Sequence, residues 1–275
     1  MQTRRHALRQ FVKVALSWLA PALLSAACVA APCESADHLT RVTGGGECLL
    51  IKTFGHAEGT KTLFVLLHGN HTSGSPAVSH LPLADTLAKL GPPGTVAVAL
   101  IRPGYDDAKG NYSSGDALRR ADNFTAENID IVADAIRRLR SFHAARRVVL
   151  IGHSGGEAMA GVVLGRRPGL VDAAVLMACP CDVPAWRAML GRRDFPWSSE
   201  SAIRYVDRVP RATRVAVVVG GRDEVTPPAL SRTYADALRA RGIAADLSIL
   251  DGVDHVAVLG SPVVVSAALR LGEGQ

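Results

Sequence analysis

The feature that most constrains this chain is a tight turn between an apolar run and a stretch of small residues. Residues 148–151 are all large and apolar, the turn runs from Gly152 to Gly156, and residues 157–164 have the composition of a packed helix. A strand that turns into a helix within two residues strains its central residue, and side chains two positions away would collide with neighbouring elements. Glycine at positions 152 and 156 removes that collision.

The central residue of this turn is Ser154. Such a turn exposes the Ser154 hydroxyl and points the backbone N–H of Gly155, at the start of a helix, toward the place where an oxyanion can form. Gly-x-Ser-x-Gly by itself is a weak signal because glycine and serine are common. The strand and helix that flank it make Ser154 a candidate nucleophile.

Strand-like and helix-like segments alternate along the rest of the chain. Apolar strand patterns are expected at 47–53, 61–67, 95–101, 147–151, 171–178, 214–219 and 244–250, and helices at 82–90, 125–142, 157–164, 228–241 and 261–271. This alternation predicts an α/β fold with a mainly parallel sheet and helices on both faces. One domain is expected over 47–275, with a lid segment at 180–209, after a lead-in segment at 31–46 whose last three residues, 44–46, are glycines and are expected to be flexible.

Four unusual loops follow apolar strands, and in a parallel sheet such loops meet at one edge. They contain His68–Gly74, Ser154, Asp223 and His255. A serine hydroxyl needs a general base to become a good nucleophile, and the base needs a carboxylate that fixes its tautomer. Ser154, His255 and Asp223 supply these three roles, in the chain order serine, aspartate, histidine.

With these residues the chain resembles the α/β-hydrolases over about residues 47–272. The stretch from Gly221 to Pro227 is similar to that of the prolyl-oligopeptidase-like and dienelactone-hydrolase-like branches. His68-Gly69 is similar to the oxyanion loop of the family, which implies that the N–H of Asn70 joins that of Gly155 as an oxyanion donor. The chain departs from the lipase version of this loop because it lacks a His-Gly-Gly-Gly run.

Other residues compete for these roles. Glu224 adjoins Asp223 but is expected to face solvent, and Asp251 is expected in a turn. Asp254 adjoins His255, and neighbouring side chains on a loop rarely face each other. His153 lies inside the turn, where it is expected to pack or line the pocket rather than act as the base. Two further histidines are expected at the surface or at the pocket entrance: His71 and His80. Two lid tryptophans can either line a substrate pocket or anchor the lid in the core: Trp186 and Trp197.

The basic charge of the chain belongs mostly to its N-terminus. The formal net charge is +6, but residues 1–30 hold four basic residues and no acidic one, which leaves 27 basic against 25 acidic residues. Basic residues, an uncharged stretch at 14–31 and small residues at its end are typical of an export signal. Arg4-Arg5 resembles a twin-arginine signal, and general secretory export remains open. An uncleaved anchor and lipidation of Cys28 are the alternatives.

An exported chain can hold disulfides. Cys33 and Cys48 would close a plausible loop. Cys179 and Cys181 leave three possibilities open: a strained bridge across Pro180, a metal site without evident further ligands, or two free thiols.

The sequence therefore predicts an exported serine hydrolase of the bacterial envelope that cleaves a carboxylic ester through an acyl-enzyme on Ser154. A peptidase or amidase is the first alternative, and a non-catalytic binding protein of the same fold is the second. We expect no cofactor and no metal, because neither a phosphate loop nor a metal-ligand spacing is evident. The expected partner is a small molecule or a peptide. Nucleic acid is not expected, because the arginines are scattered along helices.

Overall fold

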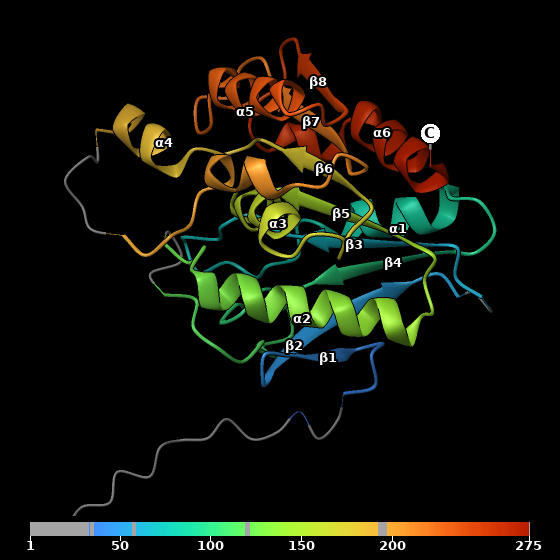
Figure 1. Cartoon of the computed structure of the whole chain (residues 1–275). Helices are drawn as coiled ribbons and strands as arrows, with labels where there is room; N and C mark the ends of the chain where they lie inside the picture. The colour runs from blue at the N-terminus through green and yellow to red at the C-terminus, as the bar shows by residue number, and fades with distance from the viewer. Residues whose placement is uncertain (1–32, 34–35, 57–58, 119–121, 192–196, 275) are drawn as a thin grey trace, which may run out of the picture.

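The sheet of this protein has eight strands in the order β1-β2-β4-β3-β5-β6-β7-β8. The computed structural model describes residues 33, 36–56, 59–118, 122–191 and 197–274. The strands are β1 (Arg41–Gly44), β2 (Glu47–Phe54), β3 (Thr62–Leu67), β4 (Thr95–Leu100), β5 (Arg147–His153), β6 (Ala173–Met177), β7 (Arg214–Gly220) and β8 (Ala245–Leu250). From β4 through β8 all neighbours are parallel, and β1 and β2 are antiparallel additions at one edge. Figure 1 shows the parallel strands ending on the same side.

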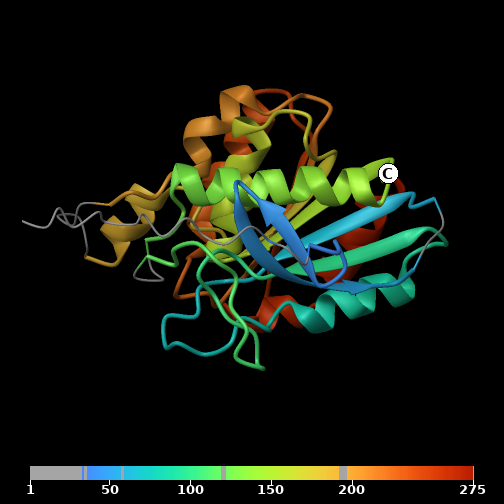
Figure 2. The ribbon, with the colours of Figure 1, turned by 90° about the horizontal axis from the view of Figure 1, so that it is seen from below.

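Helices cover both faces of the sheet, as the alternating pattern predicts. They are α1 (Leu81–Leu90), α2 (Ala126–Phe142), α3 (Gly155–Arg166), α4 (Val183–Met189), α5 (Pro228–Ala240) and α6 (Pro262–Glu273), with 3-10 helices η1 (Ala202–Arg208) and η2 (Ala257–Gly260). One core joins α2, α3 and α5 to the sheet, and a second joins α1 and α6 to its other face. Figure 2 shows α2 and α1 on opposite sides of the sheet.

Strands β3, β4 and β5 form the centre of the sheet, which agrees with the burial of their side chains. Every residue of β3 and β4 is buried, which suits strands covered on both faces. The register pairs Leu67 of β3 with Gly152 of β5. This pairing brings the end of β3 beside the turn that carries Ser154.

The N-terminal edge differs from the sequence prediction. Within the predicted lead-in segment, Arg41–Gly44 form β1 and pair with β2, so the interpretation of the three glycines at 44–46 as flexible is wrong. Gly45 and Gly46 have φ values of +57° and +90°, and positive φ at both central residues is what a two-residue hairpin turn needs. The glycines therefore make a tight hairpin and not a loose linker.

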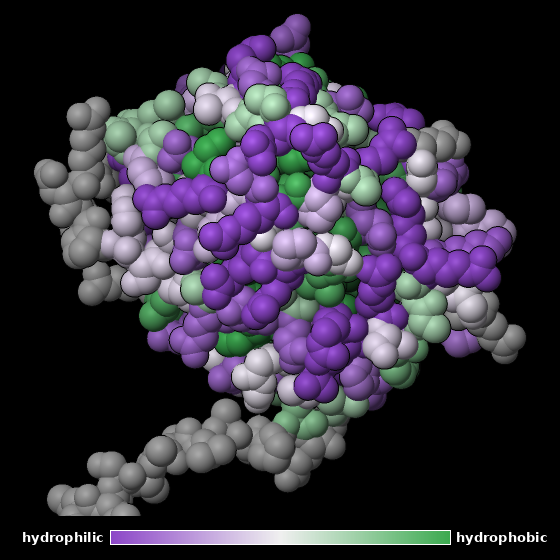
Figure 3. Space-filling model, viewed as in Figure 1, coloured by the Kyte–Doolittle hydropathy of each residue, from purple (hydrophilic) through white to green (hydrophobic). Residues whose placement is uncertain are grey.

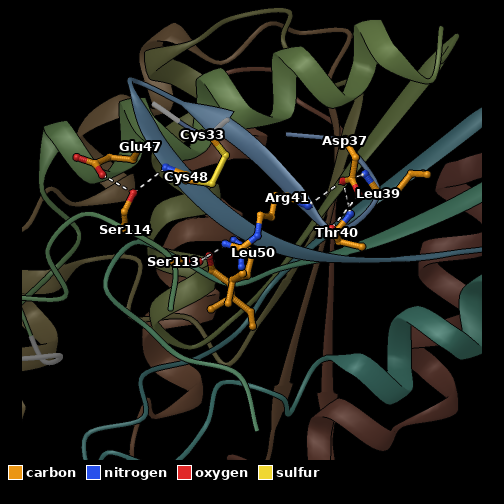
Figure 4. Close-up of a disulfide and its surroundings, with 11 residues drawn as sticks. Cys33, Asp37, Leu39, Thr40, Arg41, Glu47, Cys48, Leu50, Ser113 and Ser114 are labelled. Atoms are coloured by element: carbon orange, nitrogen blue, oxygen red, sulfur yellow. Dashed lines mark hydrogen bonds between the residues drawn. A yellow bond between two sulfur atoms is a disulfide. The ribbon is translucent and has the colours of Figure 1, made fainter. Parts of the chain in front are cut away.

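A disulfide joins Cys33 to Cys48 of β2, at a separation of 15 residues. Figure 4 shows this bridge next to a set of hydrogen bonds that hold the same edge. The Cys48 N–H donates to Ser114 Oγ at 2.6 Å, and Ser114 Oγ donates to Glu47. In the chain-entropy account, closing a loop of this size stabilises the fold by about 3 kcal/mol. The structure also pairs Cys179 with Cys181 across Pro180.

The surface over α2 is rich in charge, and Figure 3 shows this face as mostly hydrophilic. Arg137 and Arg138 both pair with Asp134 within α2, and Arg166 of α3 pairs with Asp130. These ion pairs agree with the expectation that the arginines cover solvated helix faces. The part of the chain described above has no helix long and apolar enough to cross a bilayer. The predicted export signal at 1–30 lies outside the described residues.

Candidate active site

Ser154 stands between β5 and α3 with φ +52° and ψ −119°, a strained conformation for a residue with a side chain. The two flanking glycines are needed for the reason that the sequence suggests. A Cβ on Gly152 would lie 2.6 Å from the Glu157 Cα, and one on Gly156 would collide with backbone carbonyls at the end of β3. The turn is held further by the Ser154 N–H, which donates to the Met177 carbonyl of β6 at 2.9 Å.

The structure brings Ser154, His255 and Asp223 together. His255 Nε2 lies 3.0 Å from Ser154 Oγ, and His255 Nδ1 lies 2.8 Å from Asp223 Oδ2. Because Asp223 accepts at Nδ1, the neutral imidazole carries its proton there and leaves Nε2 free to accept from the serine hydroxyl. Asp223 follows β7 and His255 follows β8, so each side chain comes from the same edge of the sheet.

The loop after β7 holds the Asp223 carboxylate. The Val225 and Thr226 N–H groups donate to Oδ1 at 3.0 and 2.8 Å, and the Thr226 hydroxyl donates to Oδ2 at 2.9 Å. Burial acts to raise the pKa of Asp223, but the hydrogen bonds from His255 and Thr226 outweigh it and leave the pKa below its ordinary value. Asp223 is therefore an anion at neutral pH, even though only 3% of it is exposed.

The side chain of His153, inside the turn, contacts the backbone of His255. Its Nε2 donates to the His255 carbonyl at 2.8 Å. Burial and the neighbouring His255 lower the pKa of His153 to about 4, so it is neutral at pH 7. This placement agrees with the expectation that His153 packs in the site, and the hydrogen bond shows what it packs against.

The other face of Ser154 is formed by the loop after β3. A Cβ on Gly69 would lie 3.3 Å from the Ser154 Cβ, and one on Gly155 would collide with the Asn70 side chain. Both glycines thus allow the 69–70 peptide to approach the serine closely. Within the described residues, the backbone N–H groups of Asn70 and Gly155 donate to no acceptor.

The competing carboxylates lie elsewhere. Glu224 and Asp251 are exposed, and Asp254 accepts from the Val256 and Ala257 N–H groups at the start of η2. These positions agree with the solvent and turn roles that the sequence suggests.

The expectation for His80 is wrong, because it lies neither at the surface nor at an entrance. It is 1% exposed, and its Nε2 donates to the Leu100 carbonyl at 3.1 Å. Burial lowers the pKa of His80 to about 3. His71 is partly exposed, and its Nδ1 lies 3.1 Å from Ser75 Oγ.

The segment predicted as a lid contacts the loop that carries Asp223. Trp186 of α4 donates from its ring N–H to the Val225 carbonyl at 2.7 Å, and the Arg187 side chain lies over the rings of Trp186 and Trp197. Trp186 therefore anchors α4 to the body of the domain.

Among the described residues, one group brings three possible metal-ligand atoms within 4.8 Å of one another: Glu157, Cys179 and Cys181. The structure pairs the two sulfurs with each other across Pro180. Cys181 Sγ lies 3.6 Å from Glu157 Oε1, and burial raises the pKa of Glu157 well above its ordinary value.

A model described as the alpha/beta hydrolase family matches residues 64–214, more than half of the chain. The chain therefore belongs to the alpha/beta hydrolase family, which confirms the family resemblance. The narrower branch stays a prediction. A search of the curated proteins finds no match.

Solved structures agree with this fold. Est1E from Butyrivibrio proteoclasticus, solved with ferulic acid bound, superposes with a TM-score of 0.64 at 15% identity, over 86% of this chain and 98% of Est1E. The Pyrococcus furiosus esterase Pf2001 gives 0.64 at 17% identity, over 85% and 89% of the two chains. The acylaminoacyl peptidase of Pyrococcus horikoshii gives 0.64 at 16% identity over 85% of this chain, which spans only 40% of the peptidase.

Several residues of the site were missed by the sequence reasoning. Thr226 had a usable signal, because Asp-x-x-Thr is a spacing at which an aspartate accepts from a backbone N–H three residues on. Arg102 and Tyr105, whose side chains donate to Asn70 Oδ1 in the loop after β3, had none. They follow β4 in a loop that is far from Ser154 in the sequence, and only the strand order places that loop beside the loop after β3.

Proposed function

We propose that this protein is a serine hydrolase that cleaves a carboxylic ester through an acyl-enzyme on Ser154. The observation that carries the proposal is the continuous path from Ser154 Oγ to His255 Nε2 at 3.0 Å and from His255 Nδ1 to Asp223 Oδ2 at 2.8 Å. Hydrogen bonds of this length let the imidazole take the serine proton as the nucleophile attacks.

Each residue then has one role. Ser154 Oγ forms a bond to the substrate carbonyl carbon while its proton moves to His255 Nε2, and Asp223 stabilises the imidazolium that forms. The N–H groups of Gly155 and Asn70 hold the oxyanion, and each such donor is worth on the order of 3 kcal/mol in the transition state. His255 returns the proton to the leaving alcohol, and a water activated by His255 then releases the acid.

Hydrolysis of an amide or peptide bond by the same residues is the second candidate. The likeness to acylaminoacyl peptidase favours it, but this chain spans less than half of that protein. Kinetics on matched p-nitrophenyl esters and p-nitroanilides with the same acyl groups separate the two. We expect kcat/KM to be larger for the esters. An equal or larger kcat/KM for the anilides would instead favour a peptidase or amidase.

We also propose that the protein is exported to the bacterial envelope. Support comes from the basic and then uncharged pattern of residues 1–30 and from the Cys33–Cys48 disulfide, because disulfides persist in oxidising compartments. Cell fractionation of the full chain beside a variant with Arg4→Lys and Arg5→Lys tests this. Loss of export in the variant would identify the twin-arginine route, and unchanged export would identify the general secretory route. A wild-type chain found in the cytosol would contradict the proposal.

A further inference from the structure

Arg102 is one of the largest fully buried side chains of the protein and lies beside the loop after β3. It follows β4, the strand next to β3, and 1% of it is exposed. Its Nη2 donates to the Gly69 carbonyl at 3.2 Å and to Asn70 Oδ1 at 2.7 Å. Its Nη1 contacts the Met159 sulfur of α3 at 3.5 Å.

This guanidinium has no counter-ion in the described part of the chain. No carboxylate there lies within ion-pair distance of Arg102, and its Nε has no hydrogen-bond partner. Burial lowers the pKa of Arg102, and Tyr105, whose ring centre lies 4.8 Å from the guanidinium carbon, acts to raise it. Arginine is nevertheless charged in proteins. A buried, unpaired cation is costly, so its position against the loop that approaches Ser154 requires an explanation.

The peptide between Gly69 and Asn70 provides one. In a trans peptide the carbonyl and the N–H point in opposite directions. Two groups donate to the Gly69 carbonyl: Arg102 Nη2, and His68 Nδ1 at 2.7 Å. The His68 proton is on Nδ1, because Nε2 accepts from the Arg102 backbone N–H at 3.0 Å. Because these two donors hold the Gly69 carbonyl in place, the planar peptide also fixes the direction of the Asn70 N–H, which points away from Arg102.

The Asn70 side chain is held by the same cation. Asn70 Oδ1 accepts from Arg102 and from the Tyr105 hydroxyl at 3.4 Å, and the Tyr105 hydroxyl accepts from Asn123 Nδ2 at 2.8 Å. A donor on the carbonyl of a peptide also polarises its N–H, which then donates a stronger hydrogen bond. Arg102 thus contacts both the backbone and the side chain that determine where the Asn70 N–H points.

We propose that Arg102 is a positioning residue for the reaction, which fixes and polarises the Gly69–Asn70 peptide and supplies the positive charge that the oxyanion needs. This inference rests on the proposed function. As Ser154 Oγ bonds to the carbonyl carbon, the π electrons of the carbonyl move to its oxygen, and the negative charge develops on the side of the peptide opposite Arg102. The cation and the developing anion then lie at opposite ends of the same peptide dipole, and the Gly69–Asn70 peptide transmits the positive charge of Arg102 to the oxyanion.

The test compares Arg102→Met, Arg102→Lys and Tyr105→Phe on a p-nitrophenyl ester, with the rate of fluorophosphonate labelling of Ser154 measured in parallel. Arg166→Met is the matched control, because Arg166 is ion-paired with Asp130 on the helical surface. We expect kcat of Arg102→Met to fall about 100-fold with KM within about twofold. Arg102→Lys keeps the charge, so its kcat should be about tenfold higher than that of Arg102→Met. The kcat of Tyr105→Phe should be about threefold below that of the wild type.

Each outcome decides. Arg102→Met that keeps its kcat within threefold of the wild type while it is folded would overturn the proposal, as would a change confined to KM. If Arg102→Met does not fold, Arg102→Lys and Tyr105→Phe decide in the same way, because a merely structural role predicts a lower Tm with unchanged kcat, as expected for Arg166→Met. Absence of both turnover and labelling in the wild type would instead refute the proposed function, and the role of Arg102 with it.

Discussion

The two sides of Ser154 differ in whether their buried charged side chain faces a titratable partner. On the side of the base, the Asp223 carboxylate faces His255, and this pair is closed by Thr226 and backbone N–H groups. On the side of the oxyanion loop, the Arg102 guanidinium has only neutral partners among the described residues. In the reaction a positive charge would develop beside Asp223 and a negative charge beside the peptide that Arg102 holds. In the proposed reaction, each side of Ser154 therefore carries the charge opposite to the one that it would stabilise.

The largest effect is expected on the side of the base, from Asp223→Asn. The amide cannot stabilise the imidazolium and can hold His255 in the wrong tautomer, so kcat should fall about 10,000-fold. Steady-state kinetics on the same ester measure this, with Glu224→Gln as the control on the exposed neighbour. The control should keep its kcat because Glu224 is exposed, and an Asp223→Asn variant that keeps its kcat would contradict the assignment of Asp223.

A smaller effect is expected where the Ser154 turn meets the His255 loop. His153→Asn shortens the side chain and leaves the His255 carbonyl without the donor that lies 2.8 Å away. The imidazole then has more freedom, and we expect kcat to fall about tenfold with little change in KM. His143→Asn, at the end of α2, is the control with no contact to the site. An unchanged kcat in His153→Asn would show that the His255 loop needs no support from the turn.

The last expected effect is on stability and not on activity. His80 has a pKa of about 3 in the folded chain against about 6.5 in an unfolded one, so the unfolded state binds the proton first as the pH falls. Stability is therefore complete above pH 6.5 and decreases toward pH 4, by about 3 kcal/mol for this residue. Urea unfolding of wild type and His80→Asn at pH 8 and pH 4 measures it. The advantage of the wild type should shrink at pH 4, and an equal advantage at both pH values would contradict the burial of a neutral His80.

Much of the fold follows from local patterns in the sequence. The apolar runs without alternation identify β3, β4 and β5, and Thr125 caps α2 by accepting from the Asn128 N–H. The hairpin of β1 and β2 was not anticipated, because three consecutive glycines also suit a linker and only the pairing partner distinguishes the two.

The candidate site separates into predictable and unpredictable parts in the same way. Ser154, Asp223 and His255 each sit in a loop whose chemistry is visible locally, and the order of the strands brings those loops together. Arg102 and His153 donate to backbone carbonyls, and a carbonyl exists at every position. No residue pattern therefore marks which carbonyl a buried side chain will reach.

The proposed function requires Ser154 to be an activated nucleophile. Intact-mass analysis of the protein after fluorophosphonate treatment, beside Ser154→Ala, measures this activation. We expect one adduct on the wild type and none on Ser154→Ala, because only a serine that loses its proton to His255 attacks the reagent rapidly. A folded wild type that forms no adduct, or an adduct that persists in Ser154→Ala, would rule out an activated Ser154 and favour a binding protein built on the same fold.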